Sequence, residues 1–156
     1  RALTAMYFGP ALNWGDVEWI KKRWGGKLIL KGIQDVEDAK LSVASGADAL
    51  IVSNHGGRQL DSVASTISQL PAIAAALDGR LPILLDGGVR SGIDILKALA
   101  LGAQGVLIGR PWAWALAAGG QPAVEQLLRT VQQELAVAMA LCGVRSLAEI
   151  DRQLLR

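Results

Sequence analysis

The sequence predicts an α/β fold, the C-terminal half of a (β/α)₈ TIM barrel, and three observations carry this prediction. Apolar strand-like segments alternate with helical ones four times, which is typical of a parallel sheet covered by helices. The segments ASGADALIVS and ALGAQGVLIG repeat a helix end, a Gly-Ala turn and a strand, whereas no GxGxxG follows the first strand. A complete barrel needs about 250 residues. The strands are expected at 28–33, 49–53, 82–87 and 105–109.

Composition narrows the class of protein. The chain has 156 residues, 51% of them hydrophobic, which suits one compact domain. A net charge of +2 without a dense basic run gives no support for nucleic-acid binding. Cys142 is the only cysteine, so no internal disulfide forms and a cytoplasmic, reducing location is expected. No apolar run reaches the roughly 18 residues of a membrane span, although peripheral contact with the inner face of the plasma membrane is compatible with the sequence.

The helices are predicted from caps and apolar spacing. Residues 1–13 are expected to be a loop tail and residues 14–156 the half-barrel. Asp16 is expected to cap a short helix whose tryptophans pack inward, and Asp35 and Ser65 to cap the next two. A fourth helix is expected over 92–101. Beyond Arg110 the chain is predicted to be fully helical, in segments 111–118, 122–143 and 146–155.

The stretch SNHGGRQLD stands where the second strand ends. His55 is the only histidine in the chain, and Arg58 follows it in a loop whose two glycines allow close approach to a ligand. A base that titrates near neutrality beside a bidentate anion clamp suits proton abstraction next to a carboxylate. The alternative, a polar loop with a surface histidine, is less favoured because loops at strand ends carry function.

The other strand ends carry an unusual set of polar residues. Lys31 interrupts an apolar strand and is costly to bury unless its charge is used, for example to stabilise an anionic cofactor. The stretches DGGVR at 86–90 and IGR at 108–110 each combine glycine, helix-start amides and an arginine, which suits a phosphate. Phosphate sites after the last two strands recur in barrels.

These motifs together carry a resemblance to a known family. LILKGI, SNHGGRQLD, LDGGVRSGIDILKALALGA and VLIGRPWAWALA resemble the FMN-dependent α-hydroxy acid oxidases and dehydrogenases, from about Trp14 to the last helix. The resemblance implies FMN as cofactor, His55 as catalytic base and substrate contact, and Arg58 as the arginine that holds the substrate carboxylate. It implies Lys31 as the lysine that stabilises reduced flavin and Ser53 as a neighbour of the ring. The implied FMN ribityl-phosphate segment comprises Asp86, Gly87, Gly88, Val89, Arg90, Gly109 and Arg110.

The implied reaction is oxidation of an L-2-hydroxy acid of the lactate, mandelate or glycolate class to the 2-oxo acid. Oxygen and a membrane quinone are both compatible as electron acceptors, and the resemblance also implies a homo-oligomer. No metal site is expected. The strands that carry the rest of the family's site are absent, so residues 1–156 alone are expected not to turn over substrate without a companion N-terminal half.

Two other readings stay open at this point. The first is another FMN barrel enzyme, such as an isomerase or an inosinate-type dehydrogenase, in which His55 would be dispensable. The second is a non-catalytic half-barrel module that self-associates through its open sheet edges. Such a module is expected to be a homodimer without flavin.

Overall fold

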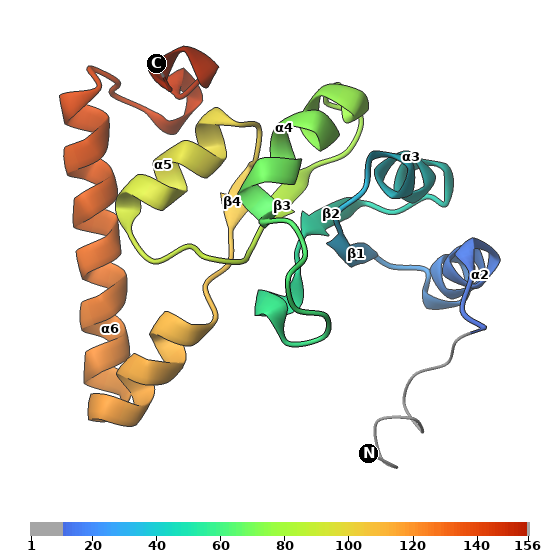
Figure 1. Cartoon of the computed structure of the whole chain (residues 1–156), viewed down its shortest axis with the longest axis horizontal. Helices are drawn as coiled ribbons and strands as arrows, with labels where there is room; N and C mark the ends of the chain where they lie inside the picture. Colours follow the sequence, from blue (N-terminus) through green and yellow to red (C-terminus); the bar gives the residue numbers. More distant parts are fainter. Residues whose placement is uncertain (1–10, 156) are drawn as a thin grey trace.

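The strands form one parallel sheet in the order of the chain. The computed structural model describes residues 11–155, and in it the sheet order is β1-β2-β3-β4 (Figure 1). A doubly wound sheet would reverse its order at a switch point, whereas a barrel segment keeps chain order. The predicted fold class is therefore confirmed; of the predicted loop tail, residues 1–10 lie outside the described residues. The strands are β1 (Ile29–Ile33), β2 (Ala49–Val52), β3 (Ile83–Leu85) and β4 (Gly105–Val106).

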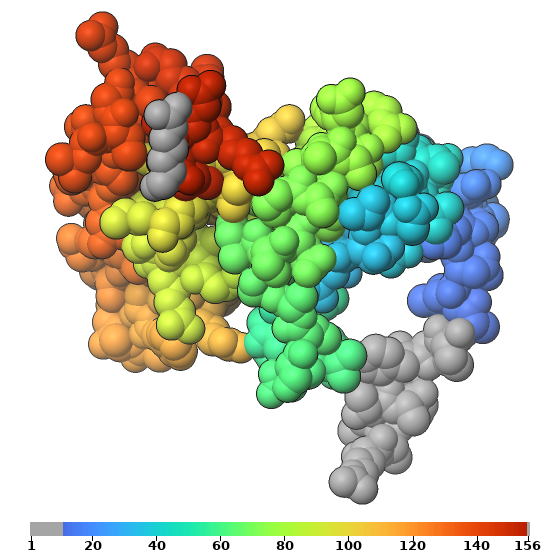
Figure 2. Space-filling model, turned by 45° about the horizontal axis from the view of Figure 1, so that its top comes forward, coloured from blue at the N-terminus to red at the C-terminus, as the bar shows by residue number. Residues whose placement is uncertain are grey.

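Helices follow each strand and cover one side of the sheet. In Figure 1, α3, α4 and α5 form an arc beside the strands, and Figure 2 shows α2 and α6 at opposite ends of the molecule. Among the described residues no helix is both long and apolar enough to cross a membrane. The helices are α2 (Trp14–Trp24), α3 (Val36–Ala44), α4 (Thr66–Leu77), α5 (Gly92–Ala100) and α6 (Arg110–Leu141).

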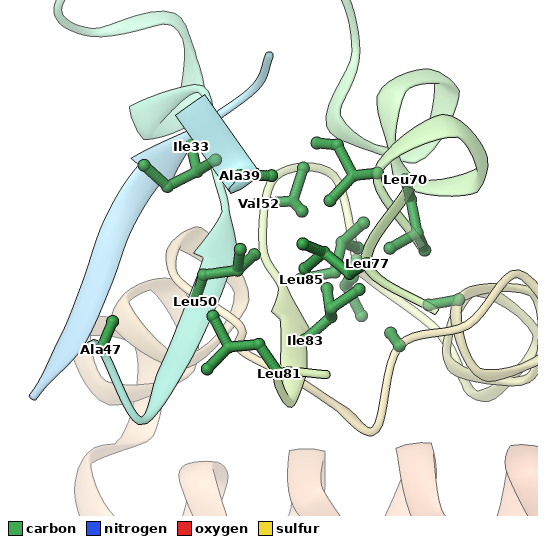
Figure 3. Packing of buried hydrophobic residues seen from close by; sticks show 14 residues of the cluster. Ile33, Ala39, Ala47, Leu50, Val52, Leu70, Leu77, Leu81, Ile83 and Leu85 are labelled. Atoms are coloured by element: carbon green, nitrogen blue, oxygen red, sulfur yellow. The ribbon is translucent and has the colours of Figure 1, made fainter. Parts of the chain in front are cut away.

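The core lies between the sheet and its helices. Figure 3 shows Val52 of β2 and Leu85 of β3 gathered with Leu70 and Leu77 of α4, and all four are buried. Strand residues alternate between two faces, so the alternate positions of β2 point away from these helices. Among them, Ile51 pairs in register with Lys31 and Leu84. This second face leads to the polar residues at the strand ends.

The repeated helix-turn-strand unit has a common geometry. The glycines that end α3 and α5 both have positive φ, +78° at Gly46 and +107° at Gly102. In each case the next residue donates back to a carbonyl of the helix, Ala47 to Ser42 and Ala103 to Ala98. This Schellman-type ending turns the chain directly into the following strand. The internal repeat thus reflects one structural solution used twice.

The first helix differs from its prediction in two respects. Its N-cap is Asn13, and Asp16 instead occupies the third helical position, where its carboxylate accepts from the Asn13 amide in a capping box. No residue of α2 is buried. Trp14 packs against the core, but Trp19 and Trp24 are 64% and 68% exposed, so the expectation that they pack inward is wrong within the described chain.

The C-terminal part also differs from prediction. Strand β4 has only two residues instead of the expected five. The expected break between 118 and 122 is confirmed, because α6 is kinked by non-helical backbone at Gly119 and Gly120. Residues 146–155 form two 3₁₀ turns, η2 (Leu147–Glu149) and η3 (Arg152–Leu154), rather than an α-helix. Ten residues have too few internal hydrogen bonds to hold a helix without a packed apolar face.

Candidate functional site

Parallel strands bring their carboxyl ends to one edge of the sheet, and this edge contains a cleft. The carboxyl-edge cleft, as we call it, has a volume of about 650 Å³. It is lined by residues that follow each of the four strands or belong to them: Lys31, His55, Gly56, Arg58, Gln59, Asp86, Gly87, Gly88, Val89, Arg90, Leu107, Ile108, Gly109, Arg110, Pro111, Trp112 and Ala113.

The loop after β2 places His55 and Arg58 at this cleft. The Asn54 side chain accepts from the Gly56 amide at 3.0 Å and caps a short turn, η1 (His55–Gly57). His55, Gly56 and Gly57 all have positive φ, which is unusual for histidine and costs backbone energy. The backbone N–H of His55 donates to Ser53 Oγ at 3.2 Å. The imidazole is thereby exposed at the strand end, and Arg58 follows one turn later.

Lys31 is held by two oxygens from the residues that directly follow β2 and β3. Its Nζ donates to Ser53 Oγ at 2.6 Å and pairs with Asp86 Oδ2 at 2.6 Å. Ser53 is fully buried, whereas the Lys31 side chain is 39% exposed toward the cleft. The ammonium is therefore fixed at the carboxyl edge while it still faces open space.

Asp86 has bonding capacity that this chain does not use. Its Oδ1 is buried and has no hydrogen-bond partner among the described residues. An ionised carboxylate can accept up to four hydrogen bonds, so a buried oxygen without a donor is costly. The other such oxygen in the described range, Oε1 of Gln34, follows β1 at the same edge of the sheet. Two buried oxygens at the carboxyl edge therefore lack hydrogen-bond donors within the described residues, and a bound group can supply such donors.

The loop at 88–90 is fixed by the cap of α5. Asp94 Oδ2 accepts from the amides of Arg90 at 2.9 Å and Ser91 at 3.0 Å, and from the Ser91 hydroxyl. Burial raises the pKa of Asp94, but these hydrogen bonds outweigh burial and hold the pKa below its usual value. The Gly92 amide donates to Glu134 of α6 at 2.8 Å. These helix-start amides, which the sequence suggested for phosphate, are already used within the protein.

The start of α6 is more open to the cleft than the start of α5. Gly109 is its N-cap and supplies no side-chain hydrogen bond to the first amides. Residues 109–113 line the cleft, so the positive end of the α6 dipole lies there. Arg110 reaches across to donate to the carbonyl of Gly56 in the His55 loop. The loops after β2 and β4 are therefore joined at the cleft.

The structure brings the residues predicted from sequence together. All of them line the cleft except Ser53, which lies behind Lys31 and supports it. The sequence analysis gave no individual role to six further lining residues, although all of them fall within the quoted motifs: Gln59, Leu107, Ile108, Pro111, Trp112 and Ala113. It also missed Thr66, whose hydroxyl donates to the Asp86 carbonyl and fixes the end of β3. A serine or threonine just after a predicted N-cap is too common to be a signal.

Fold and site define a class: part of a parallel β/α barrel with a cleft lined by lysine, histidine and arginine at the carboxyl ends of its strands. The family model for FMN-dependent dehydrogenases matches residues 1–156. The L-lactate dehydrogenase of Caulobacter sp. (strain K31) is 55% identical over 148 residues, which are 95% of this chain and 39% of that protein. That of Allorhizobium ampelinum is 57% identical over 144 residues, 92% of this chain and 38% of that protein.

Solved structures agree with this assignment. A crystal structure of mandelate oxidase with (S)-4-hydroxymandelic acid superposes with a TM-score of 0.87 at 48% identity, covering 90% of this chain and 40% of that one. The chain therefore belongs to the FMN-dependent dehydrogenase family, whose members use FMN. It spans about two fifths of the length of the relatives it matches.

Proposed function

We propose that this chain forms the part of an FMN-dependent 2-hydroxy acid dehydrogenase or oxidase that carries the catalytic base, the carboxylate clamp and the phosphate end of the FMN site. The substrate class is an L-2-hydroxy acid such as lactate, mandelate or glycolate, and the product is the 2-oxo acid. The observation that carries the proposal is the meeting of His55, Arg58 and the Lys31–Asp86 pair at one cleft in a member of this family.

The residues at the cleft fit FMN. The buried Oδ1 of Asp86 has no donor among residues 11–155, and the hydroxyls of a ribityl chain are donors of the right kind. Gly88 has φ +95° and open space where a side chain would stand, so a ligand can approach its backbone. Arg90, Arg110 and the uncapped start of α6 suit the phosphate. Bound FMN would supply the oxidant, which no side chain of the protein provides.

Three side chains at the cleft carry the remaining roles in the proposed reaction. Arg58 offers a planar fork that binds the substrate carboxylate with two hydrogen bonds and fixes the substrate's orientation. His55 takes up the proton that the hydroxy acid releases, because a neutral imidazole is a base near neutral pH. Lys31, held by Ser53 and Asp86, places a positive charge where negative charge arrives during reduction.

The test uses a fusion protein in which this chain is joined to the portion of the Caulobacter sp. (strain K31) relative that has no counterpart here. Anaerobic L-lactate and L-mandelate are added while the visible flavin absorbance is followed. We expect bleaching with one or both acids, and Arg58→Lys to raise KM by about 10-fold or more because the ammonium cannot make the bidentate contact. A fusion protein that binds FMN but bleaches with neither acid would overturn the proposed reaction.

The isomerase alternative is distinguished in the same material. His55→Ala removes the proposed base but not the residues proposed to hold FMN. Retained turnover in this variant would favour another FMN chemistry, whereas retained FMN with lost turnover supports the role of His55. Measuring the size of the isolated chain in solution tests the alternative that it is a self-associating module. The proposed function does not require a dimer.

A further inference from the structure

We propose that Gly32 is a positioning residue for His55, and this inference rests on the proposed role of His55 as the base. A Cβ atom at Gly32 would lie 2.8 Å from Cε1 of His55, closer than real Cβ contacts allow. It would also lie 3.6 Å from Nε2 and 3.8 Å from Nδ1. The ring therefore rests with its Cε1 edge against the bare backbone of Gly32.

The backbone at Gly32 is specialised for this contact. The register of β1 against β2 shifts between Lys31 and Ile33, so Gly32 is the extra residue of a bulge. Its φ of +103° is a conformation that residues with a side chain rarely adopt. The bulge lets Lys31 reach the cleft while Ile33 is buried in the core. The bulge at Gly32 thus both directs Lys31 to the cleft and leaves room for the imidazole of His55.

The His55 backbone is held independently of its ring. Its amide donates to Ser53 Oγ at 3.2 Å, and the same oxygen accepts from Lys31 at 2.6 Å. The side chain is exposed at the cleft, so rotation about its side-chain bonds is the easiest response to crowding. A methyl group at Gly32 is therefore expected to swing the imidazole away from its place above β1. The backbone of the loop is expected to stay.

The first test is direct contact by NMR in the chain itself. His55 is the only histidine, so its Hε1 resonance is unambiguous. We expect a nuclear Overhauser effect between His55 Hε1 and the Hα protons of Gly32, because Cε1 lies against that face of the glycine. Absence of this cross-peak in the folded chain would overturn the proposal, whatever the reaction of the enzyme.

The second test separates positioning from stability with a matched control. Gly102 has nearly the same φ, +107°, and its Cβ would lie 2.7 Å from Cβ of Ala74 on α4, away from the cleft. In the fusion protein, Gly32→Ala is expected to lower kcat by about 10- to 100-fold, as ångström-scale misplacement of a catalytic group does. FMN content is expected to stay unchanged because the phosphate loops are untouched, and KM is expected to change much less than kcat because Arg58 still holds the substrate carboxylate.

Gly102→Ala carries similar backbone strain and crowding, so it is expected to lower stability but leave kcat unchanged. Equal loss of kcat in both variants, or unchanged kcat in Gly32→Ala, would overturn the proposal. So would failure of Gly32→Ala to fold while Gly102→Ala folds, because Gly32 would then be a purely structural glycine. Turnover retained in His55→Ala would overturn the proposed function instead, and the NMR contact would still decide whether Gly32 seats the ring.

Discussion

Two aspartates at opposite edges of the sheet are paired with lysine but differ in how completely they are bonded. Asp48, just before β2 at the amino edge, accepts from Lys21, from Lys27 at 2.9 Å and from the Leu28 amide at 2.8 Å. Asp86, just after β3 at the carboxyl edge, pairs with one lysine through Oδ2, and its buried Oδ1 has no partner in the described chain.

The difference is the one expected between a structural ion pair and an ion pair that takes part in the proposed FMN site. The hydrogen bond from Lys21, then those from Leu28 and Lys27, hold the pKa of Asp48 far below its usual range. Both oxygens of this carboxylate accept hydrogen bonds from within the chain, and the bond from Lys21 ties α2, which has no buried residue, to the sheet. The incomplete bonding of Asp86 is stable only if something else donates to it. An unsatisfied buried group is therefore the better indicator of a binding site.

The largest effect is expected from removing His55, the proposed base at the carboxyl edge. His55→Ala in the fusion protein should lower turnover of an L-2-hydroxy acid by about 10²- to 10⁴-fold, the usual contribution of a general base. FMN content should not change, since His55 is not among the proposed FMN contacts. Steady-state kinetics with flavin absorbance as the loading control measures both. Turnover within a few-fold of the parent would exclude His55 as the base.

The next effect compares the two lysines. Lys31→Met removes one charge-assisted hydrogen bond beside the proposed flavin position, worth about 1.5–3 kcal/mol, which corresponds to about 30–60 mV for a two-electron couple. The midpoint potential of bound FMN should fall by this amount. Lys21→Met is the matched control at the amino edge and should leave the potential unchanged. Equal midpoint potentials in the two variants would exclude the proposed role of Lys31 in stabilising reduced FMN.

A third experiment concerns stability at the amino edge. Asp48→Asn should lower the free energy of unfolding of the chain at pH 7, because three hydrogen bonds lose their ionised acceptor. The folded pKa of Asp48 is depressed, so its contribution is fully present above the unfolded value of about 4 and is lost progressively as pH falls from there through the folded pKa. The difference between the variant and the parent in denaturant unfolding should therefore be smaller at pH 3 than at pH 7 without disappearing. A pH-independent difference would mean that packing, not charge, is responsible.

The smallest effect is expected from a comparison of Lys21 and Lys27, the two lysines that pair with Asp48 at the amino edge. The side chain of Lys27 is 86% exposed and that of Lys21 is 27% exposed, so solvent and salt screen Lys27 more strongly. Lys27→Ala should change the unfolding midpoint less than Lys21→Ala, which also loses a hydrogen bond to the Gly26 carbonyl. Equal midpoints for the two variants would contradict this ranking.

The sequence predicted the carboxyl edge better than the amino edge. Apolar strands that stop at polar residues identify strand ends, and parallel topology then places Lys31, His55 and Asp86 together. The Lys31–Asp86 pair was not predictable, because it depends on the exact register of β1, β2 and β3. Asp48 gave no signal, since a single aspartate before a strand resembles any turn residue.

The comparison of the two edges also explains why the predicted inward packing of Trp19 and Trp24 was wrong. Val17, Ile20 and Trp24 have helical spacing, but spacing shows only that a face exists, not that something covers it. In the described chain α2 is attached through the Lys21–Asp48 pair and through Trp14 at its first turn, and Trp19 and Trp24 stay exposed. Gly32 escaped notice because a glycine inside a strand has many causes, and the contact with His55 joins residues 23 positions apart in sequence (55 minus 32).

The central claim is that Asp86 is held ready for a ligand whereas Asp48 is not. The most direct measurement is the FMN affinity of the fusion protein with Asp86→Asn and with Asp48→Asn, determined by flavin fluorescence at pH 7. Loss of one charge-assisted acceptor should weaken FMN binding about 10- to 100-fold in Asp86→Asn. FMN affinity in Asp48→Asn should match the parent although its stability is lower. Equal FMN affinity in the two variants, or weaker binding only in Asp48→Asn, would contradict the account.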